Sequence, residues 1–415
     1  MQLPNIFKKI NVRIIAAFLA IGLIPLAVSS YFSSTRSARA LTEESFHQLD
    51  SVQAIKKKQV EDFFDQRRED MAVLMETVNQ FRLEALQKIA AIQQNKITAL
   101  QLLSNQWFID IKAQQSRSIC TKGMATYKAY LETGIKSPEY TRYSNIIDGF
   151  IKATGYHDFI IIDQDGTIVH TQAEKADYKT NLLTGPYKDS GLARAFARAR
   201  KGKIAFADFS PYAPFDNKPA AFLAAPILKG GRQNGVVALQ ISMDKIQAIM
   251  QERSGLGKTG EAYLVGPDRL MRSDSFRDPE HHSVKASFAD PEKGRVNTEA
   301  VTRALAGEDG TDIGINYIGK LVISAFKSFA IGDVDWSMIV EIEVAEALNP
   351  VDRQGKDFYQ KYIEEYGYGD LFLVQPDGYI FYTVDKKADF QTNLMTGPYK
   401  DSNLANLFRR VVRKK

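Results

Sequence analysis

The stretch Thr184-Gly-Pro-Tyr-Lys-Asp-Ser190 occurs twice in this chain, and its second copy runs from Thr396 to Ser402. The similarity extends further, because residues 155–194 align without a gap with residues 367–406, and 22 of the 40 positions are identical. A repeat of this length indicates a duplicated structural unit. Nine residues follow the second copy, and we therefore expect an incomplete repeat of the first unit over residues 355–415.

The residues around the first copy predict an α+β module with a five-stranded antiparallel sheet. Two short apolar runs flank Asp163-Gln-Asp-Gly166, an Asp-Gly turn typical of a β-hairpin. A helical segment precedes this hairpin, a second one follows it, and three more apolar runs close the unit. The expected helices are 143–153 and 192–200, and the expected strands are 159–162, 167–171, 204–209, 220–228 and 235–241. This order is typical of a sheet with helices on one side.

A second module with a similar order of elements follows. Its expected strands are 261–265, 270–274, 312–317, 321–329 and 336–343, and its helix is 298–306. The third unit repeats the first only as far as a helix over residues 404–412, and two strands alone cannot cover one face of a sheet. We therefore expect a first module (131–250), a second module (251–348) and a partial module (355–415), the last of low stability.

One segment near the N-terminus predicts a membrane anchor. Residues 14–32 carry no charge and are long enough, at 1.5 Å per residue, to cross a hydrocarbon core of about 30 Å. Lys8, Lys9 and Arg13 precede this segment, so the positive-inside rule places residues 1–13 in the cytoplasm and the rest of the chain outside it. A cleaved signal peptide is the alternative, but the length and the flanking residues favour an uncleaved anchor.

Residues 33–130 are expected to form a long helical spine. Neither glycine nor proline occurs between Leu26 and Lys122, and apolar residues recur there at helical spacing. A bend or hairpin near Asn79 remains open. The apolar stripe must be covered, either by the later modules or by the spine of a second copy in a homodimer.

The composition excludes several classes of protein. The chain has 415 residues, a net charge of +5 and 44% hydrophobic residues, which are ordinary globular values. Its basic clusters lie at the two ends without interleaved aromatics, and we expect no binding to nucleic acid. The single cysteine, Cys120, excludes an internal disulfide and fits either a reduced cytoplasm or a periplasmic domain with a large core.

The order of these parts resembles the double Cache sensor, which has a transmembrane helix, a spine helix and two PAS-like modules. In the first module the resemblance rests on the hairpin 163–166, on Gly202-Lys203 before a strand, and on Gly235-Val-Val-Ala-Leu-Gln-Ile-Ser242. In the second module it rests on Gly257-Lys-Thr-Gly-Glu-Ala-Tyr-Leu-Val265 and on Met271-Arg-Ser-Asp274. The resemblance covers residues 14–345, and the repeat over residues 355–415 resembles the start of a second double Cache unit, so we expect the given sequence to be a truncated tandem Cache chain.

This resemblance implies an extracytoplasmic sensor region of a bacterial methyl-accepting chemotaxis receptor, sensor histidine kinase or cyclic-dinucleotide enzyme. A small ligand would bind in the first module, which is membrane-distal in the family, and the signal would be a small helix displacement. The family also has a second membrane helix, a HAMP linker and an output domain, and we find none of these parts within residues 1–415. A tethered or secreted binding module without an output of its own is the alternative, provided that the stop after Lys415 is genuine. The stretch 187–203 lacks the Trp of the amino-acid-binding Arg-x-Trp-Tyr signature, so the sequence does not support recognition of an α-amino acid, and other carboxylates remain open.

A pocket in the first module would lie between the sheet and the loops over it, and it would need a few polar groups among aromatics. An aromatic ring could stack on a ligand, a lysine could bind a carboxylate, and an aspartate could accept from an amine. The candidate ligand-binding residues are His170, Tyr187, Lys188, Asp189, Asp208 and Tyr212. The competing interpretation is that the loop provides turn chemistry, with Asp189 or Ser190 capping the next helix.

Other motifs predict no cofactor, metal or catalysis. Gly255-Leu-Gly-Lys-Thr-Gly260 matches the dinucleotide fingerprint, but a helix precedes it and a strand follows it, the reverse of what that site requires. His281 and His282 are adjacent, so their side chains are expected to point apart and not to share a metal ion. No arrangement of a nucleophile and a base occurs, so we expect no enzymatic activity.

Overall fold

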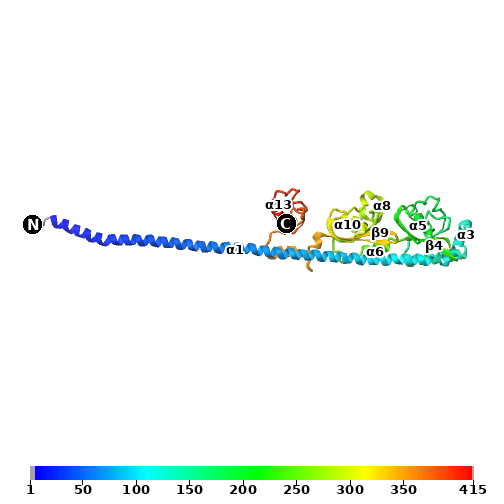
Figure 1. Cartoon of the computed structure of the whole chain (residues 1–415), viewed down its shortest axis with the longest axis horizontal. Helices are drawn as coiled ribbons and strands as arrows, with labels where there is room; N and C mark the ends of the chain where they lie inside the picture. The colour runs from blue at the N-terminus through cyan, green and yellow to red at the C-terminus, as the bar shows by residue number, and fades with distance from the viewer. Residues whose placement is uncertain (1–4, 414–415) are drawn as a thin grey trace. The chain divides into compact units, whose positions relative to one another are not determined.

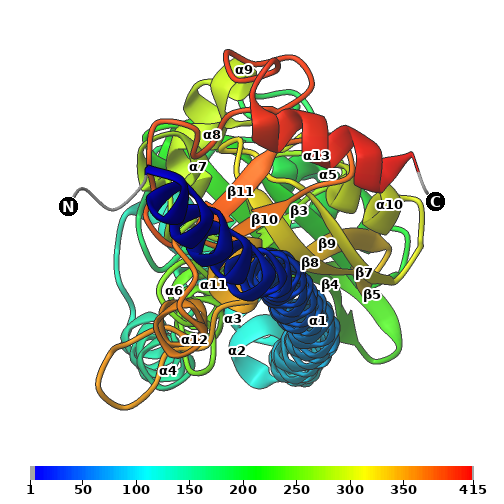
Figure 2. The same cartoon turned by 90° about the vertical axis from the view of Figure 1, so that its left-hand side faces the viewer.

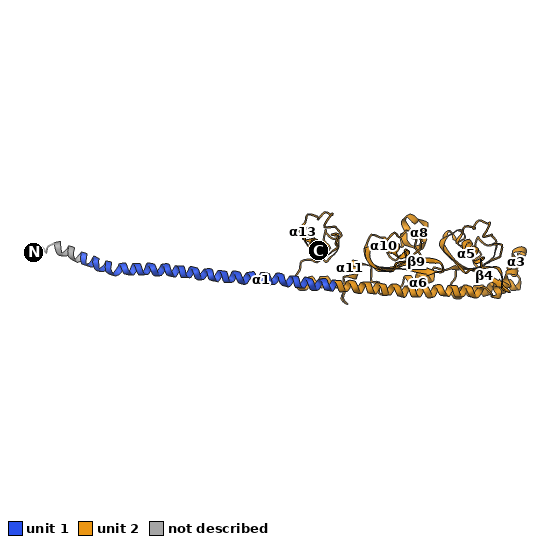
Figure 3. Ribbon diagram, viewed as in Figure 1, with its two compact units in different colours: residues 1–78 blue, residues 79–415 orange. Residues whose placement is uncertain are grey.

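The computed structural model describes residues 5–413, and side chains over residues 12–413. The chain divides into two compact units, residues 1–78 and 79–415 (Figure 3). Helix α1 (Asn5–Gln114) makes up the described part of the first unit and continues into the second. The helix is assigned without interruption through Asn79, so the hairpin considered there is absent.

The first unit contains the segment expected to cross a membrane. Every residue of 14–32 is exposed, and an 18-residue window of the helix has a mean hydropathy of 2.2. Pro25 lies inside the helix. Among the described helices, this is the one that is long and apolar enough to span a bilayer.

The first module has the predicted sheet. Its five strands are antiparallel in the order β2-β1-β5-β4-β3. Its elements are α2 (Ser118–Thr121), α3 (Gly123–Thr133), α4 (Pro138–Thr154), β1 (Asp158–Ile162), β2 (Ile168–Thr171), α5 (Gly191–Ala199), β3 (Ala205–Tyr212), a 3-10 turn (Ala213–Phe215), β4 (Lys218–Lys229) and β5 (Arg232–Ile241). The expected spine thus ends at Gln114, and α2 and α3 are separate short helices.

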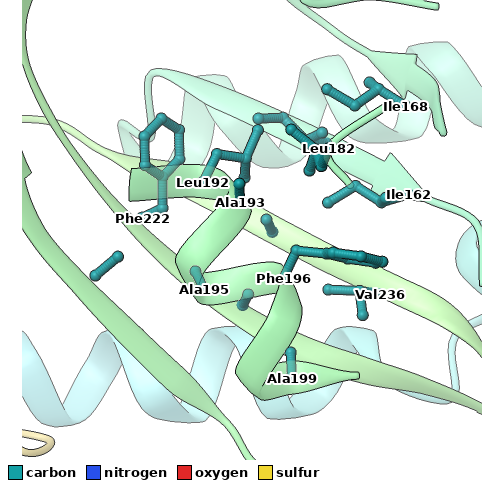
Figure 4. Packing of buried hydrophobic residues seen from close by; sticks show 14 of the residues in the cluster. Ile162, Ile168, Leu182, Leu192, Ala193, Ala195, Phe196, Ala199, Phe222 and Val236 are labelled. Atoms are coloured by element: carbon teal, nitrogen blue, oxygen red, sulfur yellow. The ribbon is translucent and has the colours of Figure 1, made fainter. Parts of the chain in front are cut away.

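Helix α5 covers the core of the first module (Figure 4). The Ser190 hydroxyl accepts a hydrogen bond from the Ala193 N–H at 3.1 Å, which confirms that Ser190 caps this helix. Leu192 and Phe196 point from α5 onto the sheet and are fully buried among Ile160, Ala224 and Ala238. The helix and the sheet therefore share one apolar core. Polar residues at one end of this core form the candidate site.

The second module differs from the prediction in one strand. Its sheet is four-stranded, in the order β6-β9-β8-β7. The expected strand 270–274 is reduced to a bridge between Val265 and Met271, because the Ser273 hydroxyl accepts from the Leu264 N–H at 2.9 Å in place of a strand carbonyl. The elements are α6 (Asp244–Met250), β6 (Glu261–Val265), α7 (Pro279–His282), α8 (Val284–Ala289), α9 (Pro291–Gly294), α10 (Glu299–Leu305), β7 (Gly310–Ile315), β8 (Leu321–Ile331) and β9 (Val334–Glu343).

The partial module reproduces the first one in detail. Its sheet has two strands, β10 and β11, with a register shift between Leu373 and Val374 that matches the shift between Ile161 and Ile162. Ser402 caps α13 as Ser190 caps α5. The elements of the partial module are α12 (Phe358–Tyr366), β10 (Phe372–Val374), β11 (Ile380–Thr383) and α13 (Asn403–Val412), and α11 (Val344–Ala347) follows β9 at the end of the second module. Figure 2 shows β10 and β11 beneath α13.

Within the second unit, the C-terminal part of α1 lies along both complete modules (Figure 1). Gln93 donates to the carbonyl of Met338 at 2.9 Å, and Gln115 donates to that of Pro226 at 3.2 Å. The Lys96 ammonium donates to the carbonyls of Ile249 and Glu252, at 2.6 and 2.8 Å, and so caps the C-terminal end of α6. Burial lowers the pKa of Lys96, but the carbonyls around it still favour the charged form.

We predict that Lys96→Met destabilises the second unit. The substitution leaves buried carbonyl groups without a donor, which should reduce the free energy of unfolding by about 1–3 kcal/mol. Chemical denaturation of the full chain in detergent, followed by circular dichroism, measures this loss. Lys88→Met, on the same helix at an exposed position, should change it by less than about 0.5 kcal/mol, and equal losses for both variants would contradict the capping role.

Candidate functional site

A group of polar side chains lies at the end of the apolar core of the first module. Asp158 on β1 is in register with Gln240 on β5, and Ile160 is in register with Ala238. Ile160 and Ala238 face the core under α5, and alternate residues of a strand share one face. Asp158 and Gln240 therefore point to the same face, and both are almost completely buried.

The loop over residues 172–190 covers this end of the sheet and adds two charged groups. Asp177 is fully buried, and its carboxylate accepts a hydrogen bond from the Tyr212 hydroxyl. The Lys175 ammonium donates to the Gln240 amide oxygen and lies 3.8 Å from a carboxylate oxygen of Asp158. We call Asp158, Lys175, Asp177, Tyr212 and Gln240 the polar cluster.

Asp158 fixes the loop to the sheet. One of its carboxylate oxygens accepts from the backbone N–H groups of Phe159 and Ala173, at 2.8 and 3.0 Å. The other oxygen accepts from the Thr171 hydroxyl at 2.6 Å. Because these donors come from β1, from β2 and from the residues just after β2, the carboxylate determines where the covering loop begins.

Two buried side-chain atoms of the cluster have no hydrogen-bond partner. They are Oδ1 of Asp177 and Nε2 of Gln240. A buried polar atom without a partner costs about 1–3 kcal/mol relative to a paired one, and native structures keep few of them. An acceptor and a donor are therefore available to a bound molecule at the polar cluster.

The charges of the cluster favour a cation. Two buried carboxylates face one ammonium group, so the cluster carries one excess negative charge when both carboxylates are ionised. Burial raises the pKa of Asp158 and of Asp177, although hydrogen bonds from Thr171 and Tyr212 and the charge of Lys175 act in the opposite direction. A second cation would stabilise the ionised form of both carboxylates.

Aromatic rings border the cluster. The centroids of Tyr187 and Tyr212 are 6.5 Å apart, and those of Tyr212 and Phe222 are 4.9 Å apart. On the other side, the Lys175 ammonium lies 4.8 Å from the centroid of Phe215. Ring faces of this kind bind cations and flat apolar groups.

The structure brings two of the predicted ligand-binding residues to this site. Tyr212 belongs to the cluster, and Tyr187 is half-buried beside it. Lys188 and Asp189 are exposed on the loop, and the Asp189 carbonyl accepts from Arg194 at 2.9 Å. Both residues lie on the exposed side of the covering loop, where they remain candidate ligand-binding residues.

His170 lies on the opposite face of the sheet. Strict alternation would place it beside Ile168 in the core, but the register shift between Ile161 and Ile162 reverses its direction. Its ring stacks on Tyr127 at 4.4 Å, and burial lowers its pKa to about 4, so the imidazole is neutral. Its ring contacts Tyr127 of α3 and Tyr140 of α4, on the face of the sheet opposite to the polar cluster.

Asp208 connects the first module to the second. Its carboxylate accepts from Nε and Nη2 of Arg272, at 3.0 and 2.7 Å, and from Nε1 of Trp336 at 3.1 Å. Arg272 is 2% exposed, and a Cβ atom at Gly266 would come within 2.2 Å of its guanidinium. Asp208 is thus paired with Arg272 between the first and second modules. It does not belong to the polar cluster, in contrast to its expected place in the ligand site.

Sequence reasoning missed Asp158, Lys175, Asp177 and Gln240. The internal repeat holds a signal for three of them, because Asp158, Lys175 and Asp177 are identical in the second copy, as Asp370, Lys387 and Asp389. Asp158 opens the apolar run Phe159–Ile162, two residues before Ile160, and so has the same parity as that core position. Gln240 lies in an apolar strand. Its place in the polar cluster follows only from the pairing of β5 with β1, which sets it opposite Asp158.

The glycine-rich segment 255–260 and the histidine pair 281–282 both form hydrogen bonds with carboxylates of the chain itself. The backbone N–H groups of Lys258 and Thr259 both donate to Glu346 at 2.7 Å, so the glycine-rich turn binds a carboxylate of the chain itself. His281 and His282 both contact Asp278, at 3.2 and 2.8 Å. Among the described residues, no group of three or more His, Cys, Asp or Glu side chains is placed to hold a metal ion.

This chain belongs to the Cache domain family, whose model matches residues 34–351. Cache domains of chemoreceptors and histidine kinases are sensor domains that bind small-molecule ligands. No curated protein sequence matches the chain.

Several solved structures are similar to this chain. The periplasmic sensory domain of a Campylobacter jejuni chemoreceptor has 13% identity and a TM-score of 0.44, over 66% of this chain and 100% of that one. The ligand-binding domain of a Pseudomonas aeruginosa amino-acid chemoreceptor, in complex with GABA, has 13% identity and a TM-score of 0.40, over 61% and 97%. An extracellular ligand-binding receptor from Desulfohalobium retbaense has 14% identity and a TM-score of 0.38, and the match covers 60% of this chain but only 39% of that receptor.

We predict that Arg272→Ala strongly destabilises the second unit. The substitution leaves the Asp208 carboxylate half-buried without its cation, and breaking a buried pair in this way costs about 3–5 kcal/mol. Thermal unfolding of the full chain in detergent measures the effect. The matched control is Arg232→Ala at an exposed position, and a melting temperature unchanged by Arg272→Ala would show that the ion pair does not hold the modules together.

A second prediction concerns pH and the buried Glu341 of the second module. Burial, and then the nearby Glu261, raise the pKa of Glu341 to about 8. The folded state therefore binds a proton more tightly than the unfolded state, so the free energy of unfolding should fall as pH rises from about 5 to about 8. Glu341→Gln should remove most of this slope in denaturation measured across that range, and an identical slope in both proteins would exclude Glu341 as its source.

Proposed function

We propose that this chain is the membrane-anchored extracytoplasmic sensor region of a bacterial receptor, either a chemoreceptor or a sensor kinase, and that its first module binds a small molecule with a cationic amine. The observation that carries the proposal is the polar cluster. Two buried carboxylates share one lysine there, and Asp177 keeps one oxygen without a donor.

The groups of the cluster define how such a ligand would bind. An ammonium group would donate to Asp177 and add the second positive charge that the two carboxylates lack. Nε2 of Gln240 would donate to a carbonyl or carboxylate oxygen of the same ligand. The rings of Tyr187 and Tyr212 would border its apolar part, and Lys188 and Asp189 would lie at the outer rim.

Entry to the site requires the covering loop to move, because Asp158 and Asp177 are fully buried. The loop has two non-glycine residues with positive φ, Glu174 at 45° and Lys179 at 68°. Both conformations carry a backbone energy penalty. We propose that the loop exchanges between a closed and an open form and that the ligand stabilises the closed one.

A path for the signal runs from the loop to the second module. Tyr212, which binds Asp177 of the loop, ends strand β3, and Asp208 on the same strand binds Arg272. Lys96 and Gln93 of α1 bind backbone carbonyls of α6 and β9. We propose that closure of the loop shifts β3, and through these contacts the spine helix, by a small displacement.

Membrane attachment and dimerisation complete the proposal. Residues 14–32 would span the inner membrane once, with residues 1–13 in the cytoplasm and the modules in the periplasm. The first unit exposes apolar side chains along α1, among them Leu49, Val52, Ile55, Val60 and Phe63. Burial of this stripe against the same helix of a second copy would give a parallel homodimer.

A ligand screen tests the function. The full chain in detergent is heated with primary amines, amino carboxylates and simple carboxylates, and we expect stabilising hits among the compounds with an amine. A ligand at one hundred times its Kd stabilises by about 2.7 kcal/mol. Asp177→Asn should abolish the shift, whereas Asp165→Asn at an exposed position of the hairpin should retain it.

Two results would contradict this proposal. Hits confined to carboxylates without an amine would show that the excess negative charge does not select the ligand. A full thermal shift in Asp177→Asn would show that the ligand binds elsewhere in the chain.

A further inference from the structure

A groove of about 440 Å³ lies between the first and second modules, away from the polar cluster. One wall is formed by α5 and strand β3 of the first module, and the other includes Asp268 and Arg272 of the second. Phe206 and Phe209 of β3 line it with apolar groups. Small-molecule sites have volumes of about 300–1,000 Å³ and combine apolar walls with a few polar groups, so the groove has the dimensions of such a site.

The wall formed by α5 is strongly basic. Residues 188–203 contain six lysines and arginines and one acidic residue, Asp189. Arg194 and Arg198 lie one turn apart on α5, and both line the groove. Because side chains four residues apart are neighbours on a helix surface, two guanidinium groups are available to one anion.

The Arg194 guanidinium is held in place by neutral acceptors. It donates to the Asp189 carbonyl at 2.9 Å and to the Ser210 hydroxyl at 3.2 Å. Within residues 12–413 it forms no ion pair with a carboxylate. An arginine side chain has five N–H donors, so Arg194 presents both an uncompensated charge and further donors to the groove.

The carboxylates around the groove already have partners. Asp208 and Asp268 both accept from Nη2 of Arg272, at 2.7 and 3.0 Å. Arg198 donates to Asp333 at 2.5 Å, but the side chains of this pair are 43% and 58% exposed, and an exposed ion pair contributes little to stability. Since Arg272 serves two carboxylates, we expect an anion at the α5 wall, where it can replace Asp333.

We infer that this groove binds the phosphate group of a small organic phosphate, with Arg194 and Arg198 as its donors. A phosphate group has three strong acceptor oxygens and matches the fork of a guanidinium group, so one phosphate can serve both arginines. The organic part would lie against the apolar side chains of β3. This site is separate from the polar cluster, and the inference does not depend on the proposed amine ligand.

Phenyl phosphate is the probe, and inorganic phosphate is the second arm. Calorimetric titration of the full chain in detergent, at constant ionic strength in a phosphate-free buffer, should show saturable binding of phenyl phosphate. Inorganic phosphate should bind more weakly, because it has no apolar part to bury. Arg194→Gln should weaken the affinity for phenyl phosphate by about tenfold or more. Arg200→Gln, an exposed position of the same segment outside the groove, should stay within about twofold.

Two further variants separate binding from structure. Asp333→Asn removes the competing carboxylate of Arg198 and should raise the affinity by about twofold or more, which a purely structural ion pair would not do. Asp177→Asn, in the polar cluster, should leave the affinity unchanged. Arg194, Arg200 and Asp333 are exposed, so the thermal unfolding of these free variants should match that of the unsubstituted chain.

Three results would overturn the inference. Heats that do not saturate, or that sodium chloride reproduces at the same ionic strength, would show an adventitious ion only. Equal affinities in Arg194→Gln and Arg200→Gln would place the anion elsewhere. Benzoate that binds as tightly as phenyl phosphate would show that the groove does not select a phosphate group.

Discussion

A carboxylate at the start of the first strand organises each of the three modules. Asp158 accepts from Thr171 and from the Ala173 N–H, and so ties the residues after β2 to the beginning of β1. Glu261 does the same at the start of β6, where it accepts from Ser275 and the Phe276 N–H, both at 3.0 Å. Asp370 accepts from Thr383 and the Val384 N–H in the partial module. The fold buries Asp158 and Glu261 and leaves Asp370 partly exposed, and all three carboxylates accept hydrogen bonds from the chain that follows.

This constraint explains why the polar cluster lies where it does. The covering loop of the first module must begin beside Asp158, and it therefore carries Lys175 and Asp177 over the same end of the sheet. Two carboxylates thus come together with one ammonium group in a buried site. The second module places Glu261 and Glu341 together in a similar way, but there the available oxygens are bound by Tyr317, Ser275, Asn316 and Tyr263. The unpaired oxygen of Asp177, which recurs at its counterpart Asp389 in the partial module, distinguishes the first module from the second.

The fold was largely predictable from the sequence, because its signals are local. The Asp-Gly hairpin, the Ser190 cap and the glycine-free spine each depend on neighbouring residues, and each is confirmed. The site was less predictable, because it depends on register and on contacts between distant residues. One register shift turns His170 away from the core, and a residue of the second module, Arg272, determines the environment of Asp208. Gln240 acquires its place only through its pairing with Asp158, which is 82 positions earlier (240 − 158) in the sequence.

The central claim is that the polar cluster binds a cation beside carboxylates whose pKa burial has raised. Calorimetric titration of the most stabilising amine at mildly acidic pH, in two buffers with different ionisation enthalpies, measures the protons exchanged on binding. A bound ammonium lowers the pKa of Asp158 and Asp177, so release of protons is expected on binding, and Asp177→Asn, which should not bind the amine, should give no binding heat. Uptake of protons, or heats that do not depend on the buffer, would contradict this claim.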